Sequence, residues 1–474
     1  DSSTSRGLGD VYKRQILFIL YTCCILLFPV SAQQIPSFKA NDRIVFLGNS
    51  ITEGGHYHSY IWLYYMTHFP ELPLRIYNGG IGGDCASHMV FRFDSDIKIK
   101  KPTYLVCSFG MNDSGYDGYN KPGYDKYANK QVEYANTEFG KLQQQILADK
   151  KIKNVVLLGS SPYDENVKLE GVETLHGKNE TIKRIIEMQA EVAQKRGWGF
   201  VNFNTVMCEL NKEIQQSDST ATFCGGDRIH PDKDGHMVMA YLFLKAQGLA
   251  GKEVAYFHIN ATNRKAMEER NCRITHIKNE NDTISFSYLS RSLPFPVDTI
   301  PRWGTKGTAR DAVRQVPFMQ EMNQEIMKVT DLHGNFRVTI DGTEIGRWDG
   351  NELSKGINLA EITCTPQYQQ SLSIMYLNEE RCAIEKRLRQ YMAMQYVFFK
   401  HRGLLFADNK AALDAAKAER ESHYLVKYLY TNYTQAMFPQ IREAWQAEID
   451  QLITQIYKIN KPLTRLIKIE RIKE

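Results

Sequence analysis

The sequence between Asp42 and Ala250 predicts an α/β fold, a doubly wound three-layer α/β/α sandwich around a parallel five-stranded sheet. Short apolar runs alternate with amphipathic stretches along this segment. Each apolar run ends at, or is followed by, Gly, Asn or Ser, residues that favour turns. Strands that alternate with helices form a parallel sheet, and right-handed crossovers place helices on both of its faces.

Five segments supply the candidate strands, each rich in Val, Ile, Leu, Phe or Tyr. They are Arg43–Leu47, Leu74–Tyr77, Thr103–Ser108, Asn154–Leu158 and Gly199–Phe203. The clearest helical pattern between them runs from Thr181 to Arg196 and ends at Gly197. A second runs from about Tyr124 to Lys150, and a last helix from His236 to Gln247 closes the unit.

The first 32 residues are not expected to belong to the folded protein. Residues 1–15 are polar and lack apolar periodicity, so we exclude them as a non-native end. An apolar run from Ile16 to Val30 follows two basic residues and leads to small residues at Ser31 and Ala32. We interpret it as a signal peptide cleaved after about Ala32, and we expect a secreted or periplasmic protein.

Alternatives to export are disfavoured. The apolar run is short for a membrane anchor. Thr22 before Cys23 is a poor context for lipid attachment. No later stretch predicts stable membrane insertion.

The net charge of +5 is small for 474 residues, and no basic stripe carries interleaved aromatics, so nucleic acid is not an expected partner. The oligomeric state stays open.

The nine cysteines do not form a disulfide framework. Two leave with the leader, and seven widely spaced ones remain, an odd number. Cys208 and Cys224 are close enough in sequence to pair around a loop, but most of the seven are predicted to be buried thiols. No CxxC pair indicates zinc.

Near residue 251 the composition changes, and 251–362 predicts a small antiparallel β module. Cys272–Ile277 and Thr283–Leu289 flank a polar turn, and a second pair of strand-like runs flanks Asp341-Gly342, a strong hairpin signal. After Pro366 the pattern is helical to the end, so 363–474 predicts a helical C-terminal region. Six apolar residues at helical spacing indicate core packing there. They are Ile441, Trp445, Ile449, Leu452, Ile453 and Ile456.

Ser50 follows the first strand in Gly48-Asn49-Ser50. A glycine turn after a buried strand presents a serine hydroxyl at the edge of a sheet, where α/β folds place reactive groups. On this stretch alone a helix N-cap is the more ordinary role. The choice therefore depends on whether a base and an oxyanion site follow downstream.

Two later blocks supply candidate oxyanion donors. Asn78-Gly79-Gly80-Ile81-Gly82-Gly83-Asp84 follows the second strand, and its glycines allow backbone amides to approach a ligand. The spacing does not fit a dinucleotide-binding loop, and no acidic residue follows at the distance needed to bind a ribose.

Asn112 in Gly110-Met111-Asn112-Asp113 follows the third strand and offers a side-chain N–H, although an ordinary Asx turn is the plainer role. It also lies in a glycosylation sequon, and must stay unmodified to act.

Asp227-Arg228-Ile229-His230 follows the fifth strand and supplies a candidate base. A carboxylate three residues before a histidine can reach Nδ1 and fix the tautomer, which leaves Nε2 to take a proton from a serine. His56, His58 and His68 lie close together in sequence but lack carboxylate partners at useful spacing for a metal site. Ser160-Ser161 after the fourth strand is most simply a turn.

These blocks, in this order, resemble the SGNH hydrolases, also called the GDSL esterase/lipase family. The resemblance covers roughly Asp42 to Leu249, with Asn49 where many members have Asp. It implies a flavodoxin-like sheet order within a 33–250 hydrolase domain, and ester hydrolysis without a metal or other cofactor. It also implies a catalytic triad of Ser50, Asp227 and His230. The implied oxyanion hole uses Ser50, Gly83 and Asn112.

The resemblance leaves the substrate open. A leader, such a domain and a β module together resemble secreted bacterial carbohydrate esterases, so we expect acetyl esters on carbohydrates. A lipid or lysophospholipid esterase is the alternative enzyme, and an acyltransferase would use the same triad. A glycan-binding protein with a vestigial hydrolase domain is the non-enzymatic alternative.

Overall fold

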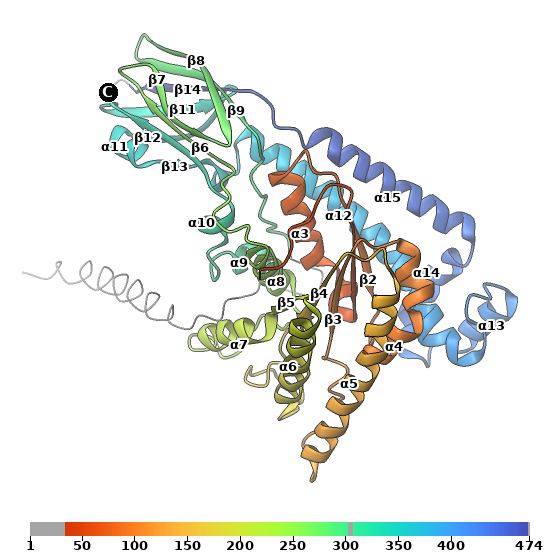
Figure 1. The fold of residues 1–474 in the computed structure, drawn as a ribbon. Coiled ribbons are helices and arrows are strands. Elements are labelled where there is room, and N and C mark those ends of the chain that lie inside the picture. Colours follow the sequence, from red (N-terminus) through yellow and green to blue (C-terminus); the bar gives the residue numbers. More distant parts are fainter. Residues whose placement is uncertain (1–33, 302–306, 473–474) are drawn as a thin grey trace, which may run out of the picture. The chain divides into compact units, whose positions relative to one another are not determined.

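The sheet that carries the candidate residues has five parallel strands in the order β2-β1-β3-β4-β5 (Figure 1). They are β1 Arg43–Gly48, β2 Arg75–Gly80, β3 Tyr104–Phe109, β4 Asn154–Gly159 and β5 Gly199–Asn202. The structure, a computed structural model, describes residues 34–301 and 307–472. The predicted non-native end and signal peptide, 1–32, lie outside the described residues. The predicted parallel sheet and its flavodoxin-like order are confirmed.

Both faces of this sheet are covered by helices. On β1, Ile44 and Phe46 point to one face while Val45 and Leu47 point to the other, and all four are fully buried. The first face packs against α3 His56–His68, α7 Phe203–Ile214 and α8 Lys233–Ala246. The second packs against α4 Ala86–Arg92, α5 Tyr124–Ala148 and α6 Lys178–Arg196. The three-layer sandwich is therefore as predicted.

The glycine block begins inside a strand. The sequence predicts that β2 ends at Tyr77, but the strand runs on to Gly80. The parallel register with β1 continues to the pair Gly48 and Gly80. Gly79 fits there because it lacks a side chain, since an added Cβ would lie 2.7 Å from the carbonyl oxygen of Phe46. Packing against β1 thus outweighs the turn propensity of the glycines.

Two sheets form the β module around a core of their own. One sheet has the order β13-β10-β6-β7, with β13 Ile357–Asn358, β10 Glu325–Thr330, β6 Ala255–Asn260 and β7 Lys265–Arg270. The other has the order β12-β11-β14-β9-β8, with β12 Thr343–Asp349, β11 Asn335–Ile340, β14 Arg465–Arg471, β9 Thr283–Ser290 and β8 Cys272–Glu280. The second sheet is antiparallel throughout, as predicted. In the first sheet, however, β10 and β6 are parallel to each other.

Two-residue turns close both predicted hairpins. Asp341 and Gly342 have φ of 51° and 84° between β11 and β12. Asn281 and Asp282 have φ of 52° and 61° between β8 and β9. Positive φ at both central residues matches the right-handed twist of the strands, which is why Asn, Asp and Gly occupy these positions.

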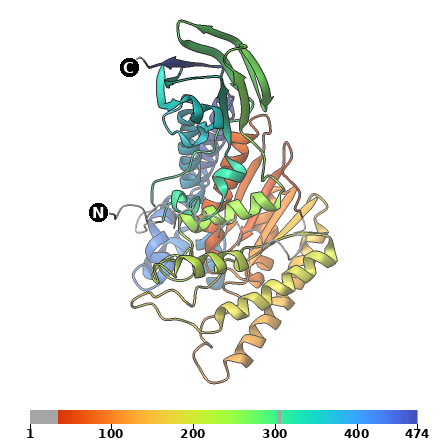
Figure 2. The same ribbon diagram turned by 90° about the vertical axis from the view of Figure 1, so that its left-hand side faces the viewer.

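The expectation that the chain is helical to its end is wrong for β14. Figure 2 shows this strand, in dark blue, beside the green and teal strands of the β module. It pairs with β11 on one side and β9 on the other. Ile467 and Ile469 alternate with polar residues and are fully buried. The period of two therefore defines the strand, despite its basic composition.

The rest of the C-terminal region is helical, as predicted. Its helices are α12 Pro366–Ala393, α13 Lys410–Ala418, α14 Tyr424–Ala436 and α15 Pro439–Ile459, with the π-helical turn η5 Met394–Phe399 and the 3-10 turn η6 Lys400–Arg402 after α12. Trp445, Ile449 and Ile456 of the predicted stripe are buried, whereas Ile441 is exposed. Over the described ranges, 34–301 and 307–472, no helix combines the length and apolarity that a membrane span needs.

Short elements link these parts. They are α2 Ser50–Gly54, η2 Phe93–Ile97, η3 Lys98–Lys100, α9 Ala309–Ala312, α10 Phe318–Met322, α11 Gly350–Lys355 and η4 Leu359–Glu361. Leu293 and Phe295, in the connector that leads to α9, are buried in the core on the first face of the five-stranded parallel sheet. The boundaries proposed at 250 and 362 stay predictions.

Candidate active site

Ser50 is the first residue of α2, directly after β1. The cap of this helix is Asn49, whose Oδ1 accepts the N–H of Ile51 at 3.0 Å. The Ser50 side chain is therefore not occupied as a cap. Gly48 is required at the turn because an added Cβ would lie 2.0 Å from Thr52 Oγ1.

A chain of two short hydrogen bonds joins the three predicted triad residues. The Ser50 hydroxyl lies 2.7 Å from His230 Nε2. His230 Nδ1 lies 2.5 Å from Asp227 Oδ2. Because an ionised carboxylate only accepts, Nδ1 carries the proton and Nε2 is left to accept from the serine. The sequence spacing predicted this arrangement, and the structure brings all three together.

The Asp227 carboxylate is held by its own loop. Its Oδ1 accepts the backbone N–H of Ile229 at 3.0 Å and of His230 at 2.9 Å. Burial raises the pKa of Asp227, but the hydrogen bond and charge of His230 outweigh it, so the net pKa is lowered. The carboxylate therefore stays ionised beside the imidazole.

Arg228 ties the same loop to the segment from Asp164 to Val172. It is buried, and its φ of 70° lies in the left-handed region. Its guanidinium donates to the carbonyl oxygens of Asp164 and Val167 at 3.1 and 2.5 Å and of Val172 at 3.2 Å. Sequence reasoning missed this residue, because an arginine between Asp227 and His230 reads as solvent-exposed.

The glycine block lies beside the serine, since a Cβ added at Gly82 would be 3.9 Å from Ser50 Cβ. Gly83 has φ of 79° and open space where a Cβ would be. The neighbouring amide of Gly82 is already used, since it donates to Glu53 Oε2 at 2.6 Å. Throughout the part of the chain that the structure describes, the Ser50 and Gly83 amides donate to no protein acceptor. Both are therefore available to a ligand oxygen.

Asn112 is fixed at both ends of its carboxamide. Its Nδ2 donates to the carbonyl oxygen of Asp84 at 2.9 Å, and its Oδ1 accepts the Tyr116 hydroxyl at 2.9 Å. One Nδ2 hydrogen remains for a ligand. Asp113 ties this block to the glycine block, because its carboxylate accepts the N–H of Ala86 and of Gly110, each at 2.8 Å.

The comparisons with known proteins agree with this geometry. The profile of the GDSL-like lipase/acylhydrolase family matches residues 46–238, and that of the diltiazem deacetylase C-terminal helical domain matches 372–461. A solved structure of a gut microbial diltiazem-metabolizing enzyme is 48% identical, with 93% of this chain and all of that chain covered and a TM-score of 0.91. The chain belongs to the SGNH, or GDSL-like, hydrolase family. It is a serine ester hydrolase.

More distant members cover only part of the chain. An acetylxylan esterase of Geobacillus stearothermophilus is 22% identical over 224 residues, which are 44% of this chain and 95% of that protein. A solved variant of an acetylxylan esterase from the same organism is 20% identical, covers 44% of this chain and 96% of its own, and has a TM-score of 0.36.

A buried ion network supports the active-site loops of this SGNH hydrolase. Arg92 donates to the carbonyl oxygens of Gly48 at 3.2 Å and Gly79 at 2.7 Å, directly beside the serine turn. It also pairs with Asp84 at 2.6 Å and Asp96 at 2.5 Å. No local sequence pattern indicates this role, because it depends on contacts between α4, η2 and two strand ends.

The remaining candidates lie outside the triad. His58 Nε2 lies 3.2 Å from the Thr52 carbonyl oxygen and His68 Nε2 lies 2.8 Å from that of Met322, in separate buried bonds. Ser160 and Ser161 are buried. The seven cysteines that lie within the described ranges are all free thiols, so Cys208 and Cys224 do not pair.

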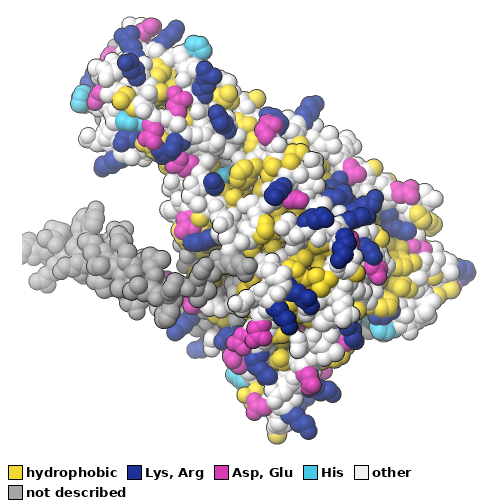
Figure 3. Space-filling view, in the orientation of Figure 1, with side chains coloured by type: hydrophobic (Ala, Val, Ile, Leu, Met, Phe, Trp, Pro, Cys, Tyr) yellow, Lys and Arg dark blue, Asp and Glu magenta, His cyan; other side chains and the backbone are white. Residues whose placement is uncertain are grey.

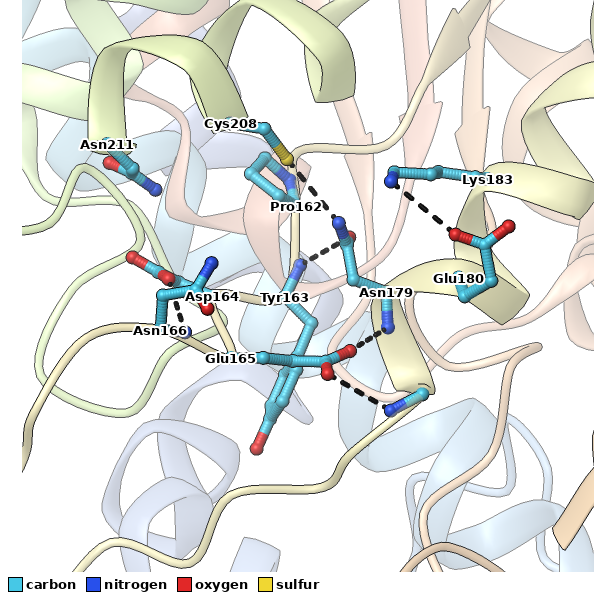
Figure 4. Close-up of a pocket in the computed structure, with 11 residues that line it drawn as sticks. Pro162, Tyr163, Asp164, Glu165, Asn166, Asn179, Glu180, Lys183, Cys208 and Asn211 are labelled. Atoms are coloured by element: carbon cyan, nitrogen blue, oxygen red, sulfur yellow. Dashed lines mark hydrogen bonds and ion pairs between the residues drawn. The ribbon is translucent and has the colours of Figure 1, made fainter. Parts of the chain in front are cut away.

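Two cavities of this SGNH hydrolase contain no triad residue. One, of about 210 Å³, is polar and lies among the residues drawn in Figure 4. Within its lining, the Glu165 carboxylate accepts the backbone N–H of Asn179, and the Asn179 side-chain oxygen accepts the backbone N–H of Tyr163. The other, of about 520 Å³, lies between β2 and helices α12 and α15. Figure 3 shows Lys and Arg side chains gathered over that region.

Proposed function

We propose that this hydrolase removes acetyl groups from esters of large alcohols, in the first place acetylated carbohydrates, with Ser50 as nucleophile. The observation that carries the proposal is the unbroken chain from the Ser50 hydroxyl through His230 to Asp227, at 2.7 and 2.5 Å. Such a chain activates a weak nucleophile without a metal.

The chemistry follows from these positions. His230 Nε2 takes the hydroxyl proton while Ser50 Oγ attacks the ester carbonyl carbon. The carbonyl oxygen becomes an oxyanion between the Ser50 and Gly83 amides and the Asn112 side chain. The alcohol then leaves with the proton from His230. Water attacks the acetyl-serine with His230 again as base, and acetate departs as Ser50 regains its proton.

An acetyl group is supported by two relatives that differ in the alcohol. One is described as an acetylxylan esterase, and the helical region of this chain matches a domain named after a diltiazem deacetylase. A large alcohol is supported by the exposure of the triad, since 42% of the His230 side chain and 49% of the Asp227 side chain face solvent. A bulky glycan can approach such a site.

A small drug-like ester is a second candidate. It is favoured by the 48% identity, over the full length of that chain, to the diltiazem-metabolizing enzyme. Both candidates place an acetyl group on Ser50 and differ only in the leaving alcohol. The lipid esterase alternative predicts instead a preference for long acyl chains.

Acetate release tests the proposal. We expect turnover of p-nitrophenyl acetate, a falling rate from butyrate to octanoate esters, and higher kcat/KM on acetylated xylo-oligosaccharides than on diltiazem. Ser50→Ala should abolish all of these in a folded protein. A preference for octanoate contradicts the acetyl assignment, a preference for diltiazem selects the second candidate, and full activity of Ser50→Ala contradicts the nucleophile. An acceptor alcohol that competes with water would reveal an acyltransferase.

We further propose export from the cytoplasm. The support is the apolar run from Ile16 to Val30 and the small residues that follow it. Sequencing the amino terminus of the protein recovered from the medium or periplasm tests this, with a start near Gln33 expected. A cytoplasmic protein that retains the apolar run contradicts it.

A further inference from the structure

Tyr116 is one of the two groups that hold the Asn112 carboxamide, and the Asp84 carbonyl oxygen is the other. The Tyr116 hydroxyl donates to Asn112 Oδ1 at 2.9 Å. Burial and the nearby Asp227 charge both raise the pKa of Tyr116 above its ordinary value, so the hydroxyl remains a donor. Because a carboxamide is planar, a bond that fixes Oδ1 also fixes both Nδ2 hydrogens. A flipped amide would turn an oxygen, rather than an N–H, toward the oxyanion.

Lys178 fixes the ring of Tyr116. Its Nζ lies 3.8 Å from the centre of that ring. The same Nζ donates to Met111 O at 2.8 Å, Ser114 Oγ at 2.6 Å and Gly115 O at 2.6 Å, which lie on both sides of Asn112 in sequence. Lys178 is fully buried, and no carboxylate within the described ranges forms an ion pair with it. A buried lysine held only by neutral acceptors is uncommon, which indicates a specific role.

The start of α6 is built to hold Lys178 in place. Lys178 is the first residue of this helix. Figure 4 shows the Glu165 carboxylate beside the helix start, where it accepts the N–H of Gly177 at 3.0 Å and of Asn179 at 2.7 Å. These two residues flank Lys178, and Asn179 Oδ1 in turn accepts the N–H of Tyr163 at 3.1 Å. The backbone at Lys178 is thus held by contacts that do not involve its side-chain amine.

We propose that Tyr116 and Lys178 are positioning residues of the oxyanion hole: Lys178 holds the Tyr116 ring, and the Tyr116 hydroxyl keeps an Asn112 N–H aimed at the reacting oxygen. This inference rests on the proposed role of Asn112. In this proposal both residues act through the amide and not by contact with the substrate. Their effect is therefore confined to the transition state, where the oxyanion carries its charge.

The main test is the kinetics of Tyr116→Phe on p-nitrophenyl acetate. Loss of the hydroxyl should lower kcat about ten-fold with KM unchanged, because an amide held only through Asp84 is less well aligned and stabilises only the charged state less well. Tyr119→Phe is the matched control. Tyr119 lies on the same loop and near the same lysine, but its hydroxyl donates to the Ser114 carbonyl oxygen at 2.7 Å. We expect near-normal kcat from it.

A double mutant separates positioning from general support of the loop. If Tyr116 acts through Asn112, Tyr116→Phe should have no further effect on kcat in an Asn112→Ala background. Equal losses in both backgrounds would overturn the inference, and so would a Tyr116→Phe enzyme with normal kcat. Lys178→Met should resemble Tyr116→Phe in its kcat loss and unchanged KM. A rise in KM alone would contradict its part.

The outcomes also distinguish this inference from the proposed function. If Ser50→Ala or Asn112→Ala keeps full kcat, the catalytic assignment itself fails. If both lose activity while Tyr116→Phe does not, only the positioning inference fails. Should Lys178→Met not fold, as judged by thermal unfolding, Tyr116→Phe and its double mutant still decide the matter.

Discussion

Arg389 holds both carboxylate oxygens of Asp96 at 2.8 Å, so α12 of the C-terminal region is ion-paired to η2 of the hydrolase domain. Arg389 Nε also donates to the Gly80 carbonyl oxygen at 3.0 Å. One helical turn earlier, Glu385 accepts the N–H of Asn78 at 2.9 Å. Ile81 of the glycine block is fully buried in the core of the helical region. The helical region is therefore part of the support of the glycine block, which carries the proposed oxyanion donor Gly83.

Arg389→Met should weaken both the fold and catalysis. Breaking a buried ion pair typically costs about 3–5 kcal/mol, and Asp96 keeps Arg92 and Lys100 as partners, so we expect the lower end of that range. Thermal unfolding and kcat on p-nitrophenyl acetate measure the two effects. The exposed Arg387 of the same helix is the control, and Arg387→Met should change neither by much. A normal kcat in Arg389→Met would show that the helical region does not position the glycine block.

Asn112→Ala should lower kcat much more than it raises KM. The lost N–H stabilises the oxyanion and not the neutral ester, and removing one such donor typically costs about 2.7–4 kcal/mol in the barrier. Initial rates over a range of ester concentrations separate kcat from KM. The reverse pattern, a raised KM with normal kcat, would mean that Asn112 only binds substrate.

Gly83→Ala should reduce kcat without a steric clash. At φ of 79° a Cβ is strained by about 1 kcal/mol, yet the space around it is open. Relief of that strain moves the amide away from the oxyanion. Gly123 is the matched control, with φ of 82° and equally open space. Gly123→Ala should lose the same stability and keep full kcat; equal kcat in both variants would exclude Gly83 as a donor.

Glu325 should make the stability of the β module depend on pH. Burial raises its pKa to about 7, against the hydrogen bonds of Tyr288 and Gln367 and the charge of Arg465, which lower it. Tyr288 and Gln367 both bond Oε1, at 2.7 and 3.0 Å, while Oε2 has no hydrogen-bond partner among residues 34–301 and 307–472.

Because the folded pKa lies above the ordinary value of 4.5, the stabilising contribution is complete at lower pH and is lost as the pH rises through about 7. The free energy of unfolding of the wild type, minus that of Glu325→Gln, should therefore fall between pH 5 and pH 8. Denaturant titrations at both values measure it. A difference that is independent of pH would show that Glu325 is ionised throughout.

The sequence was sufficient for the residues that belong to short motifs following the predicted strands. Asp227 and His230 are three positions apart, and Ser50 and Gly83 each follow a strand of the predicted sheet, so spacing and topology located them together. Asp113 also lay within the Gly-x-Asn-Asp motif. Such residues are found because a short motif and the strand end before it determine where they lie.

The residues that sequence reasoning missed are positioned by distant partners. Lys178 follows a glycine at a helix start, a setting typical of an exposed lysine, and its burial depends on the loop at Met111 to Gly115. Arg389 lies hundreds of residues from the Asp96 that binds it. The strand at Arg465–Arg471 has an alternating pattern, but the helical prediction that begins after Pro366 extends across it. No local rule predicts such contacts, because each needs the other element in place.

Because β14 comes long after the other strands of its sheet in the sequence, that sheet is completed only late in synthesis. In its sheet, β14 is the only link between the β8–β9 hairpin and the β11–β12 hairpin, as far as the described strands show. On the ribosome the two hairpins emerge long before Arg465 does, and until then each presents an unpaired edge. Such edges invite pairing with other chains. A nascent chain cut short before this strand would therefore be a substrate for chaperones and proteases, even with its triad residues already made.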